Sequence, residues 1–135
     1  MKNNSHPMPT ESELSILNVL WERGPSTVRD VYNVLNQERE TGYTTVLKLM
    51  QIMNDKKLVK RDETNRTHIY ISNYSQRKIR RNLVDDLLKK AFGGSPVHLA
   101  NTLFENEKLS KPEFEKLRNE ILTLRDEEHE HGELD

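Results

Sequence analysis

Apolar residues recur at helical spacing from about residue 10 to residue 23. This stripe consists of Leu14, Ile16, Leu17, Leu20 and Trp21. Thr10 and Glu13 have the spacing of a capping box, and Gly24-Pro25 ends the predicted helix. Ser26-Thr27 could then pair briefly as extended chain. A second amphipathic helix is predicted over residues 28–35, followed by a polar break that ends at Gly42.

A third helix is predicted from Tyr43 to about Lys57. Its buried stripe consists of Val46, Leu49, Met50 and Met53, and its other face carries Thr44, Thr45, Lys48 and Gln51. Two short, partly alternating segments at residues 58–62 and 68–72 flank a polar turn, which predicts a β-hairpin. Three helices followed by a hairpin are the element order of a winged helix-turn-helix, so the expected fold class is mostly α with a small β-hairpin.

The second half of the chain is expected to be helical throughout. A long helical pattern over residues 74–92 ends at Gly93-Gly94, and Ser95-Pro96 opens a shorter helix. Ser110 and Glu113 form a second capping-box spacing, after which apolar residues repeat in a heptad-like seam. The residues expected to form a dimer interface here are Leu83, Leu87, Phe104, Phe114, Leu117, Ile121 and Leu124. The alternative is that these helices fold back on the N-terminal domain.

These patterns divide the chain into four segments. We expect a flexible arm at residues 1–9, a winged-helix domain at 10–73, a helical dimerisation region at 74–125 and an acidic tail at 126–135. Only 33% of the residues are hydrophobic and 32% are charged. Because this apolar content is low for a self-sufficient core, we expect the chain either to stay partly disordered or to share a core with a second copy.

Composition excludes several classes of protein. The absence of cysteine rules out a disulfide scaffold and fits a reducing compartment, and the short apolar runs predict neither a membrane span nor a secretory signal. We therefore expect a cytoplasmic protein. The sequence contains no recognisable catalytic set, so we expect neither an enzyme nor a cofactor. His129 and His131 in the acidic tail are too weak a pattern to predict a metal site.

The net charge of -1 is unevenly distributed. Residues 39–82 carry 11 Lys/Arg against 4 Asp/Glu, whereas residues 105–135 carry 5 against 11. A basic block of this kind attracts a polyanion. The candidate DNA-binding residues within it are Tyr43, Thr44, Thr45, Lys48, Gln51, Lys60, Arg61 and Arg66.

Each of these residues has an ordinary structural explanation as well. Thr44 and Thr45 could cap a helix, and Lys48 could be a solvated surface lysine. Taken together inside a basic block, they favour a helix that enters the major groove of DNA, with Arg66 at the tip of the hairpin. The rival hypothesis is a winged-helix adaptor that binds protein, which would expose an apolar patch on the third helix.

Several motifs together resemble the penicillinase-repressor (BlaI/MecI/CopY) family. They are Glu13 to Trp21, Glu22-Arg23-Gly24-Pro25, Thr27-Val28-Arg29-Asp30-Val31, Tyr43-Thr44-Thr45-Val46, Lys56-Lys57-Leu58-Val59 and Arg66-Thr67-His68-Ile69-Tyr70. The resemblance covers about residues 10–125. The chain departs from the family's usual residues at Lys48, Ile52-Met53 and Lys57, which leaves the operator sequence open.

The resemblance implies a dimeric winged-helix repressor that binds double-stranded DNA at dyad operators. In the antibiotic-resistance branch of the family, repressors are released by cleavage linked to a membrane metallopeptidase sensor. The cleaved Asn-Phe bond of that branch has its nearest match here at Asn101-Thr102, with Phe104 two residues further on. The copper-responsive branch uses a cysteine-rich site, and this chain has no cysteine.

Overall fold

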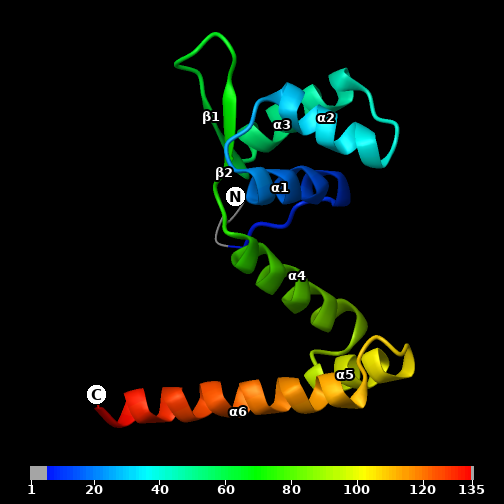
Figure 1. Cartoon of the computed structure of the whole chain (residues 1–135), viewed down its shortest axis with the longest axis vertical. Coiled ribbons are helices and arrows are strands. Elements are labelled where there is room, and N and C mark those ends of the chain that lie inside the picture. The colour runs from blue at the N-terminus through cyan, green and yellow to red at the C-terminus, as the bar shows by residue number, and fades with distance from the viewer. Residues whose placement is uncertain (1–5, 135) are drawn as a thin grey trace. The chain divides into compact units, whose positions relative to one another are not determined.

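The computed structural model describes residues 6–134, with side chains through residue 127. This part of the chain contains six helices and one two-stranded antiparallel hairpin, which confirms the predicted fold class (Figure 1). The elements are α1 (Glu11–Arg23), α2 (Val28–Glu38), α3 (Tyr43–Asp55), β1 (Val59–Asp62), β2 (Ile69–Ser72), α4 (Gln76–Ala91), α5 (Pro96–Glu105) and α6 (Lys111–Leu134). The chain divides into two compact units between Asp86 and Leu87, inside α4. None of the described helices is long and apolar enough to cross a membrane.

Both α1 and α2 begin with a capping box. Thr10 Oγ1 accepts from the Glu13 N–H at 3.2 Å, and Glu13 Oε1 accepts from the Thr10 N–H at 2.9 Å, as the spacing predicted. At the start of α2, Thr27 and Asp30 exchange the same two hydrogen bonds, each 3.0 Å long. This second box holds the Thr27-to-Asp30 turn in one conformation, so α2 starts at Val28.

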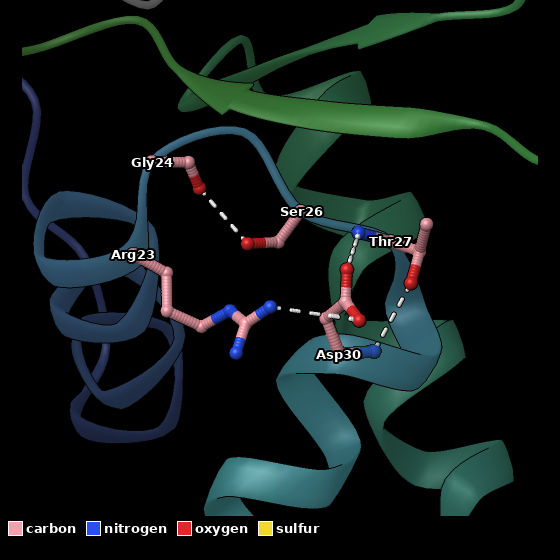
Figure 2. A network of polar contacts seen from close by, with 5 residues as sticks. All are labelled: Arg23, Gly24, Ser26, Thr27 and Asp30. Atoms are coloured by element: carbon pink, nitrogen blue, oxygen red, sulfur yellow. Dashed lines mark hydrogen bonds and ion pairs between the residues drawn. The ribbon is translucent and has the colours of Figure 1, made fainter.

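The turn between α1 and α2 depends on Gly24. This glycine has a φ of +87°, which few other residues adopt, and it lets the chain reverse after Arg23. Figure 2 shows how the turn is held: the Ser26 hydroxyl donates to the Gly24 carbonyl at 2.9 Å, and Arg23 points toward Asp30 across a 3.7 Å ion pair. The turn thus positions Ser26 beside the hairpin.

The hairpin is attached to the helices at two places. Ser26 pairs with Tyr70 of β2 through two backbone hydrogen bonds of 2.8 and 3.1 Å, which confirms the extended pairing suggested by the sequence. On α1, the Trp21 indole N–H donates to both the Tyr74 carbonyl (2.9 Å) and the Ser72 hydroxyl (3.1 Å). Because both contacts involve β2 or its exit, they hold this strand to the helical core.

One apolar core lies beneath these elements. Its buried residues come from α1, α2, α3 and the hairpin: Ile16, Leu17, Val19, Leu20, Val28, Val31, Val46, Met50, Met53, Leu58, Val59 and Tyr70. Three of the four residues in the predicted stripe of the third helix are buried here, and Leu49 packs against them. The opposite face of α3 is therefore turned to solvent.

An ion pair with one buried member joins α1 to the end of α3. Glu13 in the first turn of α1 is 1% exposed, and its Oε2 lies 2.9 Å from the Nζ of Lys56 at the end of α3. Burial by itself raises the pKa of Glu13, but the Thr10 N–H, the Lys56 ammonium and the Thr10 hydroxyl together lower it below the ordinary value of 4.5. The carboxylate is therefore ionised at neutral pH.

After Lys56, the chain leaves α3 through a Schellman motif. The Leu58 N–H donates to the Met53 carbonyl at 2.9 Å, and the Lys57 N–H donates to the Asn54 carbonyl at 3.1 Å. Lys57 sits at the left-handed position of this motif with a φ of +65°, where glycine is usual. The strained residue thus lies at the turn from α3 into the hairpin.

The N-terminal segment before α1 is packed against the first unit. Pro7 and Pro9 lie in the predicted flexible arm, yet both are buried. The Pro7 carbonyl accepts a 3.0 Å hydrogen bond from the side chain of Asn82 in α4. Figure 1 shows this segment passing beside the first turns of α4. Residues 1–5 of the predicted arm lie outside the described residues.

The second unit comprises the end of α4, α5 and α6. In its described part no side chain is fully buried, and every side chain of α6 through residue 127 is exposed. Phe104 of α5 and Phe114 of α6 meet edge to face, with ring centroids 5.3 Å apart. The helix α6 continues to Leu134, where the sequence predicted an acidic tail from residue 126. Because glutamates are good helix formers, this charged stretch extends the helix.

We expect the Glu13–Lys56 pair to make stability depend on pH in the acid range. A carboxylate with a lowered pKa stabilises the fold above its unfolded pKa, and this contribution is lost as pH falls through the folded value. Glu13→Gln keeps a capping-box side chain but removes the charge. It should lower the free energy of unfolding at pH 7 by about 1.5–3 kcal/mol and flatten its decline below pH ~4.5. Urea unfolding measured at a series of pH values checks this.

The matched control is Glu11→Gln, an exposed carboxylate in the same turn of α1. It should leave both the stability and its pH dependence close to wild type. Equal behaviour of the two variants would show that the ion pair contributes nothing.

We also expect Lys57→Gly to stabilise the protein. A left-handed backbone costs a non-glycine residue about 1–2 kcal/mol, and glycine removes that cost at the price of more freedom in the unfolded chain. The midpoint of urea unfolding should therefore rise. Lys57→Ala, which keeps the strain while removing the same charge, should not raise it. An equal rise in both variants would assign the effect to charge.

Candidate nucleic-acid interface

The solvent face of α3 is polar. Successive residues of a helix are rotated by about 100°, so Thr44 and Lys48 lie opposite the buried Val46 and Met50. Gln51 lies on one flank of this face and Thr45 on the other, and all four predicted residues are exposed. The large apolar side chain exposed on this helix is Ile52, at 38%. This is a single residue, so the described part of α3 presents no apolar patch of the kind an adaptor needs.

The two flanks of α3 face different surroundings. On the side of Thr45, a hollow of about 80 Å³ is lined by residues of α1, α2 and the loop that precedes α3. On the side of Gln51, a wider groove of about 340 Å³ separates α3 from the hairpin. The four predicted DNA-binding residues of α3 therefore lie in different surroundings. Thr44 and Lys48 form a central ridge, whereas Gln51 and Thr45 lie on two unequal flanks.

The groove between α3 and the hairpin is basic. Its charged and polar lining includes Arg29, Tyr43, Gln51, Arg61, Arg66 and His68, and no Asp or Glu is among the described residues that line it. Five of these six come from α3 or the hairpin, and the sixth comes from α2. A groove of this composition suits an anionic backbone.

Arg29 is a residue that the sequence analysis did not single out as a site. Its guanidinium lies 4.4 Å from the ring centroid of Tyr43 and 5.6 Å from that of Tyr32. The two rings themselves meet edge to face at 5.6 Å. Arg29 and Tyr32 are three residues apart on α2, a spacing that the sequence does reveal. Their contact with Tyr43 is a tertiary one, which no local pattern indicates.

The hairpin separates its two predicted cations onto opposite faces. In the antiparallel register, Arg61 is opposite Tyr70 and Lys60 is opposite Ile71. Tyr70 is buried, so Arg61 faces the helical core and the groove, whereas Lys60 faces away from them into solvent. The pKa of Arg61 is raised by the Tyr70 hydroxyl and by Glu63, whose carboxylate lies 2.8 Å away. Arg61 is thus engaged within the hairpin, while Arg66 in the connecting loop is exposed.

The predicted dimerisation residues differ in exposure. Leu83 lies in the first unit and is half-buried, whereas Leu87 of the second unit is exposed. Of the seam on α6, Phe114 and Leu117 are about 40% exposed, and Ile121 and Leu124 are 53% and 60% exposed. Phe104 is brought against Phe114 within one chain. Phe114 is thus partly covered by Phe104, whereas Ile121 and Leu124 at the other end of the seam remain more than half exposed.

The predicted cleavage residues lie inside α5. Asn101 is exposed, and the hydroxyl of Thr102 donates to the His98 carbonyl one turn earlier, at 3.0 Å. Among the described residues there is no cluster of three His, Asp or Glu side chains that could hold a metal. The side chains of His129 and His131 lie outside the described part of the chain.

Comparison with known proteins identifies the family. Residues 9–123 match the model of the family described as penicillinase repressor. The transcriptional regulator BlaI of Mycobacterium tuberculosis is 30% identical over 113 residues, which cover 83% of this chain and 81% of BlaI. The methicillin resistance regulatory protein MecI of Staphylococcus aureus is 21% identical over 119 residues, which cover 88% of this chain and 96% of MecI.

The structural comparison is weaker than the sequence comparison. A solved structure of Lactococcus lactis ZitR is similar over 92% of this chain and 85% of that one, at 13% identity. Its TM-score of 0.42 is too low to support a conclusion about function. The family match and the BlaI relative carry the assignment: the chain belongs to the penicillinase repressor family and is a transcriptional repressor.

Proposed function

We propose that this repressor binds double-stranded operator DNA as a homodimer, with α3 of each subunit in a major groove. The observation that carries the proposal is the exposed polar ridge of Thr44 and Lys48 beside the basic groove. The major groove admits an α-helix, and lysine and threonine can both bond to base edges or phosphates there. Thr44, Lys48 and Gln51 contact base edges, while Tyr43 and Thr45 contact the backbone.

The hairpin extends this interface. Arg66 reaches the minor groove or the phosphates next to the site of α3, where arginine is favoured electrostatically. Arg29, held over the Tyr43 ring, binds a phosphate of the strand that passes through the groove. Lys60 contributes to the long-range positive field, since it faces away from the groove. Arg61 acts mainly by shaping the hairpin.

Dimerisation through the second unit covers the apolar seam. Burying one leucine or isoleucine fully is worth about 1.5–3 kcal/mol, and four such positions recur along α6 from Phe114 to Leu124. In a dimer with a twofold axis, the seam of each subunit packs against the same seam of the other. The same symmetry matches a dyad operator with half-sites about one helical turn apart. Two weakly binding heads linked in this way bind far more tightly than either one alone.

Proteolysis is the proposed route of release. A cut between Asn101 and Thr102 separates the winged unit from α6, which removes the linkage between the two heads. Because both residues are helical, α5 must open locally before a protease can act. A membrane metallopeptidase sensor is the proposed trigger of that step.

We expect Lys48→Ala to reduce sequence discrimination. Duplexes selected by the wild-type protein from random DNA provide the site, and a scrambled duplex of equal length is the reference. If Lys48 reads a base, the loss is about 1–3 kcal/mol on the selected site and much smaller on the scrambled one. Arg29→Ala should instead weaken both equally and reduce the slope of log K against log salt by about 0.9. Fluorescence anisotropy titrations at several salt concentrations measure both quantities.

Lys108→Ala serves as the control, because this exposed lysine lies in the second unit between α5 and α6, outside the basic block of residues 39–82. It should change neither discrimination nor salt slope. If wild type binds no duplex, or if its affinity is insensitive to salt, the proposed interface is wrong.

We also expect Ile121→Glu to separate the dimer. A charge in the centre of the seam cannot be buried without a partner, so the variant should sediment as one 15.9 kDa chain at micromolar concentration. Asn119→Glu introduces the same side chain on the opposite face of α6 and should remain dimeric. If both variants remained dimeric, the α6 seam would not be the dimer interface. If the wild-type protein were monomeric, the proposed dimer would itself be wrong.

A further inference from the structure

The first turns of α4 are attached to the winged unit by few residues. Among the described residues, this helix makes only sparse contacts with the other helices and strands. Two of its side chains are nevertheless buried: Ile79 completely, and Asn82 with 6% exposure. Neither belongs to the main apolar core. Something other than that core must therefore cover them.

The N-terminal segment contacts one of these two side chains, Asn82. Pro7 and Pro9 are buried, whereas Met8 between them is exposed. The Nδ2 of Asn82 donates to the Pro7 carbonyl at 3.0 Å, across 75 residues of sequence. A buried amide that loses its hydrogen-bond partner destabilises the fold, so this asparagine favours a segment that brings a carbonyl to it. A leucine at this position would fill the same space but would not need a carbonyl group as a hydrogen-bond partner.

A helix held at one point can still rotate about that point, whereas a helix held at two points has a fixed direction. Helix α4 is held at two such points. The first is the chain entering α4, where the Trp21 indole holds the Tyr74 carbonyl at 2.9 Å. The second is Asn82, about two helical turns further along. Between them, the buried side chain of Ile79 also holds the start of α4. The contact between Pro7 and Asn82 adds a hydrogen-bonded attachment further along the helix, which restricts its swing about that start.

We propose that this contact is a strap that determines which half-site spacing the repressor accepts. The inference rests on the proposed function, because spacing matters only to a dimer that binds two half-sites. Asn82 is then a positioning residue: it touches no DNA, yet it fixes the direction in which α4 leaves the winged-helix domain. Pro7 and Pro9 hold the other end of the strap.

The lever arm makes the effect large. The 16 residues of α4 span about 24 Å, so a swing of about 10° at its start moves its end by about 4 Å. One base pair displaces a half-site by about 3.4 Å and rotates it by about 35°. A strapped α4 should therefore distinguish spacings that differ by one base pair. A loose α4 should accept several, each with a lower effective concentration of the second head.

The experiment uses a dyad site that the wild-type protein selects from random duplex DNA. Its half-sites are moved together or apart by one and two base pairs, and affinities are measured for the series and for a single half-site. Asn82→Ala removes the donor, and Pro7→Gly loosens the segment without deleting a side-chain hydrogen bond. Arg81→Ala and Met8→Gly are their matched controls, each an exposed neighbour.

For wild type and both controls, we expect affinity to fall by at least about tenfold from the best spacing to the worst. In Asn82→Ala and Pro7→Gly this ratio should drop below about threefold, while single half-site affinity and dimer mass stay unchanged. If Asn82→Ala does not fold, as judged by thermal unfolding, Pro7→Gly carries the test.

Folded, dimeric variants that keep the wild-type ratio would overturn the strap. The proposed function fails in a different way: the wild-type protein would then be monomeric, or would bind the dyad no better than one half-site. The two failures are thus distinguished by the wild-type measurements alone.

Discussion

The contact between the buried Glu13 carboxylate and Lys56 joins the beginning of α1 to the end of α3. Burying a carboxylate is costly, and hydrogen bonds and a nearby cation must offset that cost, whereas the Lys56 side chain stays 40% exposed to water. Here the carboxylate also receives the Thr10 N–H, so one side chain caps α1 and receives the last cation of α3. Helix α3 is thereby held at the end from which the hairpin departs. Its angle to the core, and the position of the groove beside it, depend on this junction.

Local chemistry allowed much of the fold to be predicted. The stripe of Val46, Met50 and Met53 placed the buried face of α3, and therefore its solvent face, because helical periodicity relates the two directly. The capping box of Thr10 and Glu13 likewise marked the start of α1. The capping box of Thr27 and Asp30 was not predicted, although its spacing is the same, because aspartate replaces the usual glutamate.

The features that sequence could not supply are contacts between distant residues. Nothing local indicates that Glu13 meets Lys56, that Arg29 lies over Tyr43, or that Asn82 meets Pro7. The distinction between Lys60 and Arg61 is an intermediate case. Alternation along a strand says that they face opposite ways, but only the pairing of Arg61 with the buried Tyr70 says which one faces the groove. Their shared positive charge alone predicted the same DNA-binding role for Lys60 and Arg61.

The two units differ in what each can stabilise by itself. The first encloses a core contributed by three helices and a hairpin, so the exposed polar face of α3 is held in place by buried residues beneath it. The second leaves every described α6 side chain exposed, and the edge-to-face pair of Phe104 and Phe114 joins α6 to α5. In the proposed dimer, a second copy supplies the apolar burial that a unit built in this way lacks. Separating the two copies would then also remove support for α5 and expose its backbone to the proposed cleavage. The proposed dimerisation and the proposed cleavage thus have one physical origin, the missing core of this unit.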